Sequence, residues 1–254
     1  MPGVMDGGVS QTGVFGLSAV ILVGGFGTRI RHITGTVPKP LVMVCGKPFL
    51  YWIFQSLKRR GIDNVYLLTH FEAEQIEKFA RGEESRDFRI RCVKESTPSG
   101  TGGSVLDFLA KTDTLSSTFL LLNGDSLLMD YSLQSALNAL SEGSEAVIFG
   151  VPMDDASRYG TLNYNDFGRL MAFREKAPGA GVINTGAYLF TRQAFSKVAN
   201  SNRPISLELD VIPSMIESEV HIKVLPISSQ FIDIGTEASL AEAERFVRDN
   251  FVGK

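Results

Sequence analysis

The sequence predicts an α/β protein with a mainly parallel β-sheet that is flanked by helices. Short runs of apolar and β-branched residues alternate with segments whose apolar residues recur at helical spacing. Such alternation is typical of parallel strands joined by crossover helices. The 254 residues, of which 44% are hydrophobic, are also sufficient for one large domain with its own core.

The first half of the chain contains the predicted parallel strands. Residues 18–23 form a β-branched run that ends abruptly at two glycines, which is typical of a buried strand. Residues 49–60 place Phe49, Ile53 and Leu57 on one helical face before Gly61 ends the pattern. The other elements follow in order as a strand over 64–69, a helix over 73–81, a strand over 88–93, a helix over 102–111, a strand over 118–122, a helix over 133–140 and a strand over 146–151.

The second half has a different pattern. Residues 161–164 and 170–173 flank the turn sequence N-D-F-G, which indicates a hairpin. The remaining predicted elements are a strand over 182–190, helices over 194–199 and 207–217, a strand pair over 222–225 and 231–232, and a helix over 236–246. We therefore expect a small antiparallel element laid across the parallel sheet.

Composition limits the organisation and the partners of the chain. Residues 1–17 are glycine-rich and lack Lys and Arg, so we expect a disordered leader and not a secretory signal. Residues 18–254 are expected to form a single domain with halves at 18–151 and 152–254. A net charge of −3 and the absence of a long apolar run argue against nucleic-acid and membrane partners. Cys45 and Cys92 are interpreted as reduced core residues, which fits a cytoplasmic protein.

A glycine-rich loop follows the first predicted strand. Residues 24–29 read G-G-F-G-T-R, and residues 38–40 read P-K-P. Three glycines in four positions allow backbone N–H groups to approach an anion, and Arg29 and Lys39 can neutralise phosphate oxygens. No Lys-Ser or Lys-Thr pair follows the loop, and the third glycine of a dinucleotide motif is missing. The pattern therefore predicts a nucleoside triphosphate site of another kind.

Two aspartates occupy the ends of predicted strands. Asp125 follows the apolar strand 118–122, and Asp233 precedes a glycine turn in the segment I-D-I-G-T. Taken alone, Asp125 either caps the next turn or holds a divalent cation. Two carboxylates at strand ends supply the hard oxygen ligands that Mg²⁺ prefers, with waters and phosphate completing the octahedron.

The loop, Arg29 and the P-K-P segment together resemble the signature of the sugar nucleotidyltransferases, also called nucleotide-sugar pyrophosphorylases. The chain has Ile30 where the family has leucine, and His32 where proline is common. The resemblance implies a Rossmann-like fold, the nucleotide-diphospho-sugar transferase fold, with its antiparallel element over the sugar site. It also implies catalytic roles for Arg29 and Lys39, nucleotide contacts from Gly24, Gly25, Gly27 and Thr28, and Mg²⁺ bound by Asp125 and Asp233.

Residues 94–103, K-E-S-T-P-S-G-T-G-G, resemble the family segment that binds the base, which implies nucleotide contacts from Glu95, Gly100 and Thr101. Guanine presents two adjacent donors that a single carboxylate can accept together. Glu95 therefore favours GTP, although some relatives with glutamate at this position use pyrimidine nucleotides.

The sugar side is implied by three further segments, R-Y-G-T at 158–161, F-R-E-K at 173–176 and I-N-T-G at 183–186. Without the resemblance, the E-K pair could be a solvated strand edge and the N-T-G group a bulge. Ser206 with Glu208 or Asp210 could simply begin a helix, although a similar basic and S-L-E-type patch borders the phosphate pocket in the family. The sugar-phosphate-binding residues that the resemblance implies are Tyr159, Gly160, Glu175, Lys176, Asn184 and Arg203.

Within the family, the sequence resembles the D-glycero-D-manno-heptose 1-phosphate guanylyltransferases in its G-T-G-G and R-Y-G-T motifs and its length. The implied partners are GTP and a sugar 1-phosphate, and the implied product is a GDP-heptose for cell-surface polysaccharide biosynthesis. Mannose 1-phosphate as acceptor, a uridylyl or thymidylyl transfer to a hexose 1-phosphate, and a non-catalytic nucleotide-sensing subunit remain alternatives. A serine or cysteine hydrolase is disfavoured, because no G-x-S-x-G motif is present. The oligomeric state is left open, and a homo-oligomer is compatible with the sequence.

Overall fold

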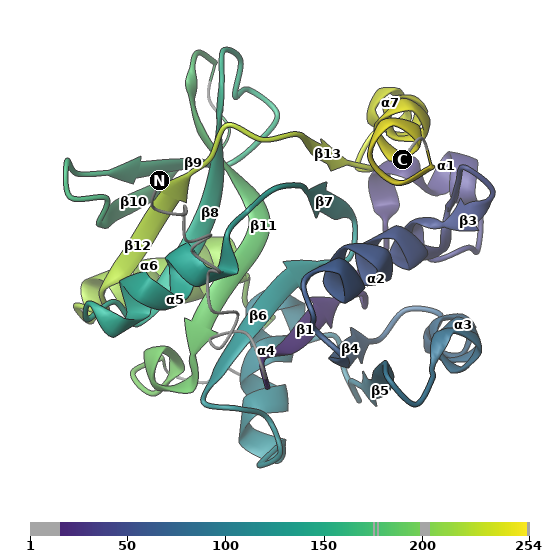
Figure 1. Ribbon diagram of the computed structural model, residues 1–254, viewed down its shortest axis with the longest axis horizontal. Helices are drawn as coiled ribbons and strands as arrows, with labels where there is room; N and C mark the ends of the chain where they lie inside the picture. Colours follow the sequence, from purple (N-terminus) through teal and green to yellow (C-terminus); the bar gives the residue numbers. More distant parts are fainter. Residues whose placement is uncertain (1–15, 175, 177, 199–203, 253–254) are drawn as a thin grey trace, which may run out of the picture.

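The computed structural model describes residues 16–174, 176, 178–198 and 204–252, which contain one nine-stranded sheet with helices on both faces (Figure 1). The predicted leader lies outside the described residues except for Gly16 and Leu17, and Leu17 is buried beside the first strand. Among the described residues, no helix is long and apolar enough to cross a membrane.

Seven strands form the long axis of the sheet. Their order is β12 (Ile222–Pro226), β8 (Ala146–Met153), β11 (Gly181–Thr191), β6 (Thr118–Asn123), β1 (Ser18–Leu22), β4 (Asn64–Thr69) and β5 (Arg89–Lys94). Only β11 runs against its neighbours in this series. The mainly parallel sheet that the sequence predicts is therefore confirmed. Leu22 pairs in register with both Leu68 and Asn123, so the carboxyl ends of three parallel strands lie level with one another.

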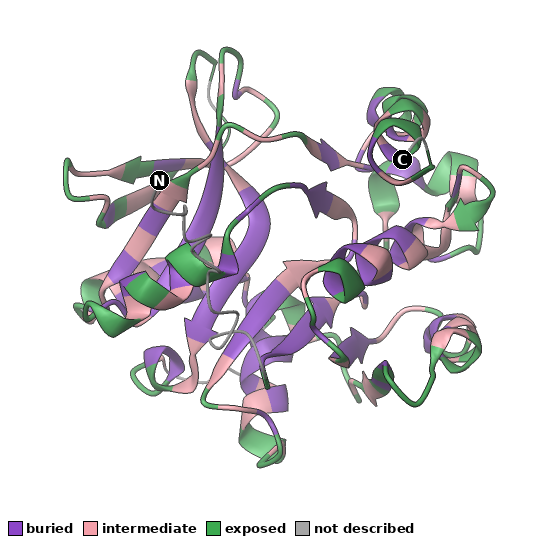
Figure 2. Ribbon diagram, in the orientation of Figure 1, coloured by how far each residue is buried: buried purple, intermediate pink, exposed green. Residues whose placement is uncertain are grey.

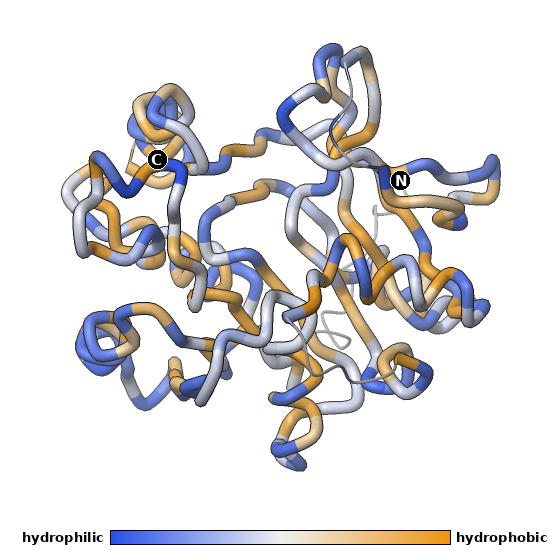
Figure 3. Tube along the Cα trace, turned by 180° about the vertical axis from the view of Figure 1, so that it is seen from behind, coloured by the Kyte–Doolittle hydropathy of each residue, from blue (hydrophilic) through white to orange (hydrophobic). Residues whose placement is uncertain are grey.

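The alternation of side chains along β1 divides the core into two layers. Ala19 and Ile21 belong to one hydrophobic cluster and Val20 to the other. Helices α2 (Phe49–Arg59), α3 (Ala73–Glu83), α5 (Leu133–Ser141) and α7 (Glu237–Val247) contribute to the first cluster, and α4 (Gly100–Lys111) and α6 (Ile212–Glu217) to the second. Buried residues follow the strands in Figure 2, and the reverse view in Figure 3 shows hydrophobic residues along the strands and hydrophilic residues on α3.

The antiparallel element is a hairpin formed by β9 (Thr161–Tyr164) and β10 (Leu170–Arg174), and it joins the sheet where Thr161 pairs with Ile183 of β11. The prediction that residues 222–225 and 231–232 pair with each other is wrong. β12 lies beside β8, whereas β13 (Phe231–Asp233) pairs with β7 (Ser126–Leu128). This second pairing brings the end of the chain to the carboxyl end of β6.

Two predicted helices also differ in the structure. The helix expected over 194–199 is a short 3₁₀ turn, Arg192–Phe195, and residue 199 lies outside the described residues. The helix expected over 207–217 begins as a π-helical turn, Leu207–Val211, before α6. Pro213 has no N–H to donate to the carbonyl of residue 209, so a regular α-helix cannot continue through that bond.

Several short elements were not predicted from the sequence. They are the 3₁₀ turns Thr28–Ile30 and Lys39–Leu41, α1 (Arg31–Thr34), the strands β2 (Met43–Val44) and β3 (Lys47–Pro48), β7, and the last turn Arg248–Val252. Each spans only two to five residues, which is too short for a periodic pattern.

The N-terminus of α4 is packed tightly against the backbone of residue 205. The carbonyl of Ile205 accepts hydrogen bonds from the N–H groups of Gly102 and Gly103 at 3.0 and 3.4 Å, so it satisfies donors that every helix start leaves free. Gly100 has a φ of +80°, and a Cβ at this position would lie 2.3 Å from the same carbonyl oxygen. Only glycine fits there without moving one backbone away from the other.

We expect Gly100→Ala to lower the free energy of unfolding by roughly 3 kcal/mol, because it adds a steric clash to an unfavourable φ. Urea denaturation measures this loss. Gly61→Ala is the matched control, since Gly61 has a φ of +72° with open space around it; about 1 kcal/mol is expected there. Equal losses in the two variants would contradict the packing argument.

Candidate active site

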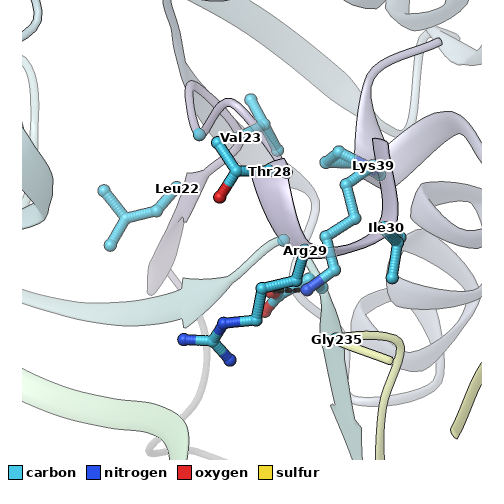
Figure 4. Close-up of a pocket in the computed structure, with 12 residues that line it drawn as sticks. Leu22, Val23, Thr28, Arg29, Ile30, Lys39 and Gly235 are labelled. Atoms are coloured by element: carbon cyan, nitrogen blue, oxygen red, sulfur yellow. Dashed lines mark hydrogen bonds and ion pairs between the residues drawn. The ribbon is translucent and has the colours of Figure 1, made fainter. Parts of the chain in front are cut away.

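The glycine-rich loop turns sharply where β1 ends. Gly27 adopts a left-handed conformation with a φ of +59°, and a Cβ there would lie 3.3 Å from the Cβ of Lys39. The 3₁₀ turn that follows buries Ile30 and exposes Arg29. Together with residues 124 and 235, these side chains line a cavity that we call the loop cavity (Figure 4). Among the described residues, Arg29 makes no hydrogen bond or ion pair, so its guanidinium is free to bind a ligand.

Lys39 and Asp125 form an ion pair at the base of the loop cavity. The Lys39 Nζ lies 2.5 Å from Asp125 Oδ2, and the exposed fractions of the two side chains are 14% and 38%. Asp125 lies two residues after the end of β6, and the intervening Gly124 donates a backbone hydrogen bond to the carbonyl of Leu22 in β1. Because the carboxyl ends of β1 and β6 lie close together, the Asp125 carboxylate and its partner Lys39 lie next to the glycine-rich loop.

Asp233 lies beside Asp125 because β13 pairs with β7. Asp233 is the register partner of Ser126, and the N–H of Ile234 donates to the carbonyl oxygen of Asp125 at 2.9 Å. The Asp233 carboxylate accepts hydrogen bonds from the Tyr159 hydroxyl at 2.5 Å and from the N–H of Gly235 at 2.6 Å. Burial raises the pKa of Tyr159 well above its usual range and the Asp233 carboxylate raises it further, so the phenol remains a donor.

The donor set at these strand ends fits a divalent cation. Asp125 and Asp233 supply hard oxygen atoms to one cavity, as Mg²⁺ requires. The described part of the chain contains no group of three or more His, Cys, Asp or Glu side chains that could hold a metal. A cation held here would therefore take its remaining ligands from water and from substrate phosphates, which is how Mg²⁺ is usually bound.

A larger cavity of about 610 Å³, which we call the large cavity, adjoins the loop cavity and shares Arg29, Lys39 and Asp125 with it. Of the residues predicted on the sugar side, four line the large cavity: Tyr159, Gly160, Lys176 and Asn184. Asp233 lines it as well. The predictions for Glu175 and Arg203 fall outside the described residues.

A third cavity, which we call the Glu95 cavity, shares Leu22, Gly25 and Asp125 with the loop cavity. Its lining includes the predicted nucleotide residues Gly24, Gly25, Glu95, Gly100 and Thr101, and also Asp125. The Glu95 carboxylate accepts hydrogen bonds from the Ser99 N–H and hydroxyl at 3.4 and 3.2 Å through one oxygen, Oε2. Glu95 therefore orders the start of α4, and in the part of the chain that the structure describes its second oxygen accepts no hydrogen bond.

Arg158 and Glu208 line the large cavity and Tyr188 donates a hydrogen bond to Glu208, but none of the three is among the predicted site residues. Arg158 lies 3.5 Å from Asp233 and is the first residue of the R-Y-G-T segment, so that motif could have identified it. Tyr188 lies at a buried strand position, whereas Glu208 lies in the S-L-E segment, which resembles a patch that borders the phosphate pocket in the family. Tyr188 carries no local signal, since its proximity to Glu208 depends on the fold.

Comparison with known proteins adds a further finding. The sequence matches the family described as nucleotidyl transferase over residues 18–250. It is 32% identical over 224 residues to mannose-1-phosphate guanylyltransferase catalytic subunit beta of Danio rerio, a match that covers 86% of the chain and 61% of that relative. It is 31% identical over 230 residues to D-glycero-alpha-D-manno-heptose 1-phosphate guanylyltransferase of Aneurinibacillus thermoaerophilus, covering 90% of the chain and 97% of that relative.

Among solved structures, HddC from Yersinia pseudotuberculosis complexed with GMP-PN superposes with a TM-score of 0.78 and 28% sequence identity. The superposition covers 91% of this chain and 99% of that one. The chain thus matches HddC and the heptose relative over nearly their whole length, whereas it spans only 61% of the length of the mannose relative.

Proposed function

The chain belongs to the nucleotidyl transferase family, and from this membership we propose that it transfers a nucleotidyl group from GTP to a sugar 1-phosphate. The observation that supports the proposal is the convergence of Arg29, Lys39, Asp125 and Asp233 on the large cavity, with the glycine loop beside them. The two cations can pair with phosphate oxygens, and a divalent cation held by the two carboxylates would add the positive charge that a triphosphate requires during reaction.

In the proposed reaction an oxygen of the sugar phosphate attacks the α-phosphorus of the nucleoside triphosphate. The new P–O bond forms as the bond to the β-phosphate bridging oxygen breaks, and pyrophosphate leaves with that electron pair. The attacking oxygen is already an anion, so no side chain has to remove a proton. The protein must align two anions and offset their repulsion, and alignment of this kind can supply roughly 7–11 kcal/mol of the barrier.

Each residue of the site has a role that follows from its position. Arg29 is exposed at the loop and stabilises charge on the leaving pyrophosphate, while Lys39 and Lys176 hold the reacting phosphates. Asp125 and Asp233 would hold a divalent cation, which when bound neutralises phosphate charge as a Lewis acid. Tyr159 keeps Asp233 oriented through its hydrogen bond.

The preference for guanine is inferred from Glu95. Its free carboxylate oxygen lies in the Glu95 cavity, and a carboxylate can accept from the two adjacent donors of guanine. The relatives compared above are guanylyltransferases by name. For the acceptor we favour D-glycero-D-manno-heptose 1-phosphate over mannose 1-phosphate, because the heptose relative is matched over 97% of its length.

A substrate panel tests the proposal. The protein is incubated with Mg²⁺, pyrophosphatase and each of the four common nucleoside triphosphates, with heptose, mannose or glucose 1-phosphate added in turn. We expect phosphate release only with a sugar phosphate present, highest for GTP with the heptose 1-phosphate. Binding of GTP without release under any pairing would contradict the proposal and indicate a nucleotide-sensing protein.

A further inference from the structure

The carboxylate of Glu208 lies where three separate elements meet. Its Oε2 atom accepts hydrogen bonds from the Ser206 hydroxyl at 3.0 Å and the Thr101 hydroxyl at 3.3 Å. Its Oε1 atom accepts from the Tyr188 hydroxyl at 3.4 Å. Thr101 belongs to α4 and Tyr188 to β11, while Ser206 precedes the π-helical turn that carries Glu208.

The hydroxyl protons of this cluster all point toward the carboxylate, because the hydroxyl oxygens already accept other hydrogen bonds. Thr101 Oγ1 accepts from the N–H of Leu207 at 2.8 Å. Ser206 Oγ accepts from two N–H groups of the following turn, both at 3.2 Å. The Tyr188 hydroxyl accepts from the Asn184 side-chain amide at 2.6 Å. Each hydroxyl therefore offers only its proton, and the carboxylate is the terminal acceptor of the network.

The remaining hydrogen-bonding capacity of Glu208 is that of an acceptor. A carboxylate has about four lone-pair positions, and among the described residues three are taken by the hydroxyl groups. The side chain is half-buried and lines the large cavity, so a ligand in that cavity can reach the remaining position. A phosphate oxygen cannot fill it, since two acceptors of like charge repel each other. The partner must be a donor, such as a hydroxyl group.

The charges around the large cavity also separate a region suited to phosphate from the Glu208 region, which is suited to a hydroxyl donor. Lys39, Lys176, Arg29 and Arg158 line it and suit the phosphate groups, whereas Glu208 is placed with the hydroxyl cluster. Tyr188 is fully buried, and burial together with the nearby Glu208 carboxylate raises its pKa well above the usual range, so it stays a donor to Glu208. The network thus keeps the carboxylate ordered and acceptor-only.

On the basis of the proposed function, we propose that Glu208 is a specificity-determining residue that accepts a hydrogen bond from a ring hydroxyl of the sugar 1-phosphate. The interaction selects a polyhydroxylated acceptor and orients its ring relative to the reacting phosphate. It rejects acceptors that lack the hydroxyl, because the remaining lone-pair position of Glu208 would then be left without a hydrogen-bond donor in the complex.

The test combines Glu208→Gln with monodeoxy analogues of the acceptor that the wild type uses, heptose or mannose 1-phosphate, altered at carbons 2, 3 and 4. In the wild type, one analogue is expected to lose at least about 10-fold in kcat/KM. In Glu208→Gln, the KM for the natural acceptor is expected to rise about 10-fold or more while the KM for GTP stays within about twofold. In this variant the loss in kcat/KM for the same analogue should largely disappear, because the substitution has already weakened the hydrogen bond that the missing hydroxyl would make.

Glu217→Gln is the matched control, since it makes the same change at an exposed carboxylate of the following helix α6 that does not line the large cavity. Its acceptor KM is expected to stay near that of the wild type. Equal use of all deoxy analogues by the wild type would overturn the proposal without any variant. An unchanged acceptor KM in Glu208→Gln, or the same analogue penalty in both proteins, would also overturn it. A wild type that transfers to no sugar phosphate would instead refute the proposed function.

Discussion

Arg29→Ala is expected to lower kcat/KM for nucleotidyl transfer by about 10²–10³-fold, which corresponds to roughly 3–4 kcal/mol of transition-state stabilisation. The guanidinium lines both the loop cavity and the large cavity, and among the described residues it has no internal partner. Its charge is therefore available to the leaving pyrophosphate, where negative charge increases during the reaction. A coupled assay for pyrophosphate release measures the effect.

Protein stability separates this effect from misfolding. Because Arg29 is exposed, the free energy of unfolding should stay within about 0.5 kcal/mol of the wild type. Arg31→Ala is the control, since Arg31 is also exposed, lies two residues further on and contacts the ring of Phe71 instead of the cavities. Its turnover is expected to be unchanged. Wild-type pyrophosphate release in Arg29→Ala would exclude the role given to this residue.

Asp125→Asn is expected to reduce turnover by about 10³-fold, because a divalent cation supplies several kcal/mol of charge stabilisation and asparagine binds it weakly. The substitution also removes the charge that pairs with Lys39. Since the Asp125 side chain is 38% exposed, we expect this loss to lower stability by only about 1 kcal/mol. The loss of activity should therefore far exceed the loss of stability.

Turnover measured against Mg²⁺ concentration checks this expectation. Asp113→Asn serves as the control, because Asp113 is an exposed carboxylate that lines none of the three cavities. Its response to Mg²⁺ should match that of the wild type. If Asp125→Asn reached wild-type turnover at high Mg²⁺, the carboxylate would affect only the affinity for Mg²⁺. If the variant had wild-type turnover at every Mg²⁺ concentration, Asp125 would have no part in binding the cation.

The sequence predicted the central elements of the fold because their patterns are local. The runs at 18–23, 64–69 and 118–122 are continuous and apolar, and each forms a parallel strand close to its predicted bounds. The family resemblance drawn from residues 24–29 and 38–40 is likewise confirmed by the match over residues 18–250.

Pairings between distant short segments could not be predicted. β7 and β13 have three residues each and lie about a hundred positions apart, so nothing in either segment identifies its partner. Their pairing nevertheless sets the position of Asp233. The π-helical turn before Pro213 also departs from the predicted helix, because one missing donor changes the backbone path.

The candidate site shows the same division between local and distant signals. The cation and carboxylate positions follow from short motifs, and the structure brings Arg29, Lys39, Asp125 and Asp233 to one cavity. Their catalytic roles stay predictions. Gly100 was expected to admit the base, whereas the structure reveals a second constraint, the carbonyl of Ile205 against its Cα. That constraint depends on residues a hundred positions away and has no local sequence signal.

The central claim is that the cationic side chains and a cation bound by two carboxylates act on the same triphosphate. Titration of a non-hydrolysable GTP analogue with and without Mg²⁺ tests it most directly, in the wild type and in the Asp125→Asn, Asp233→Asn double variant. We predict that Mg²⁺ tightens binding at least about 10-fold in the wild type and by less than about twofold in the double variant. Equal tightening in the two proteins would contradict the claim.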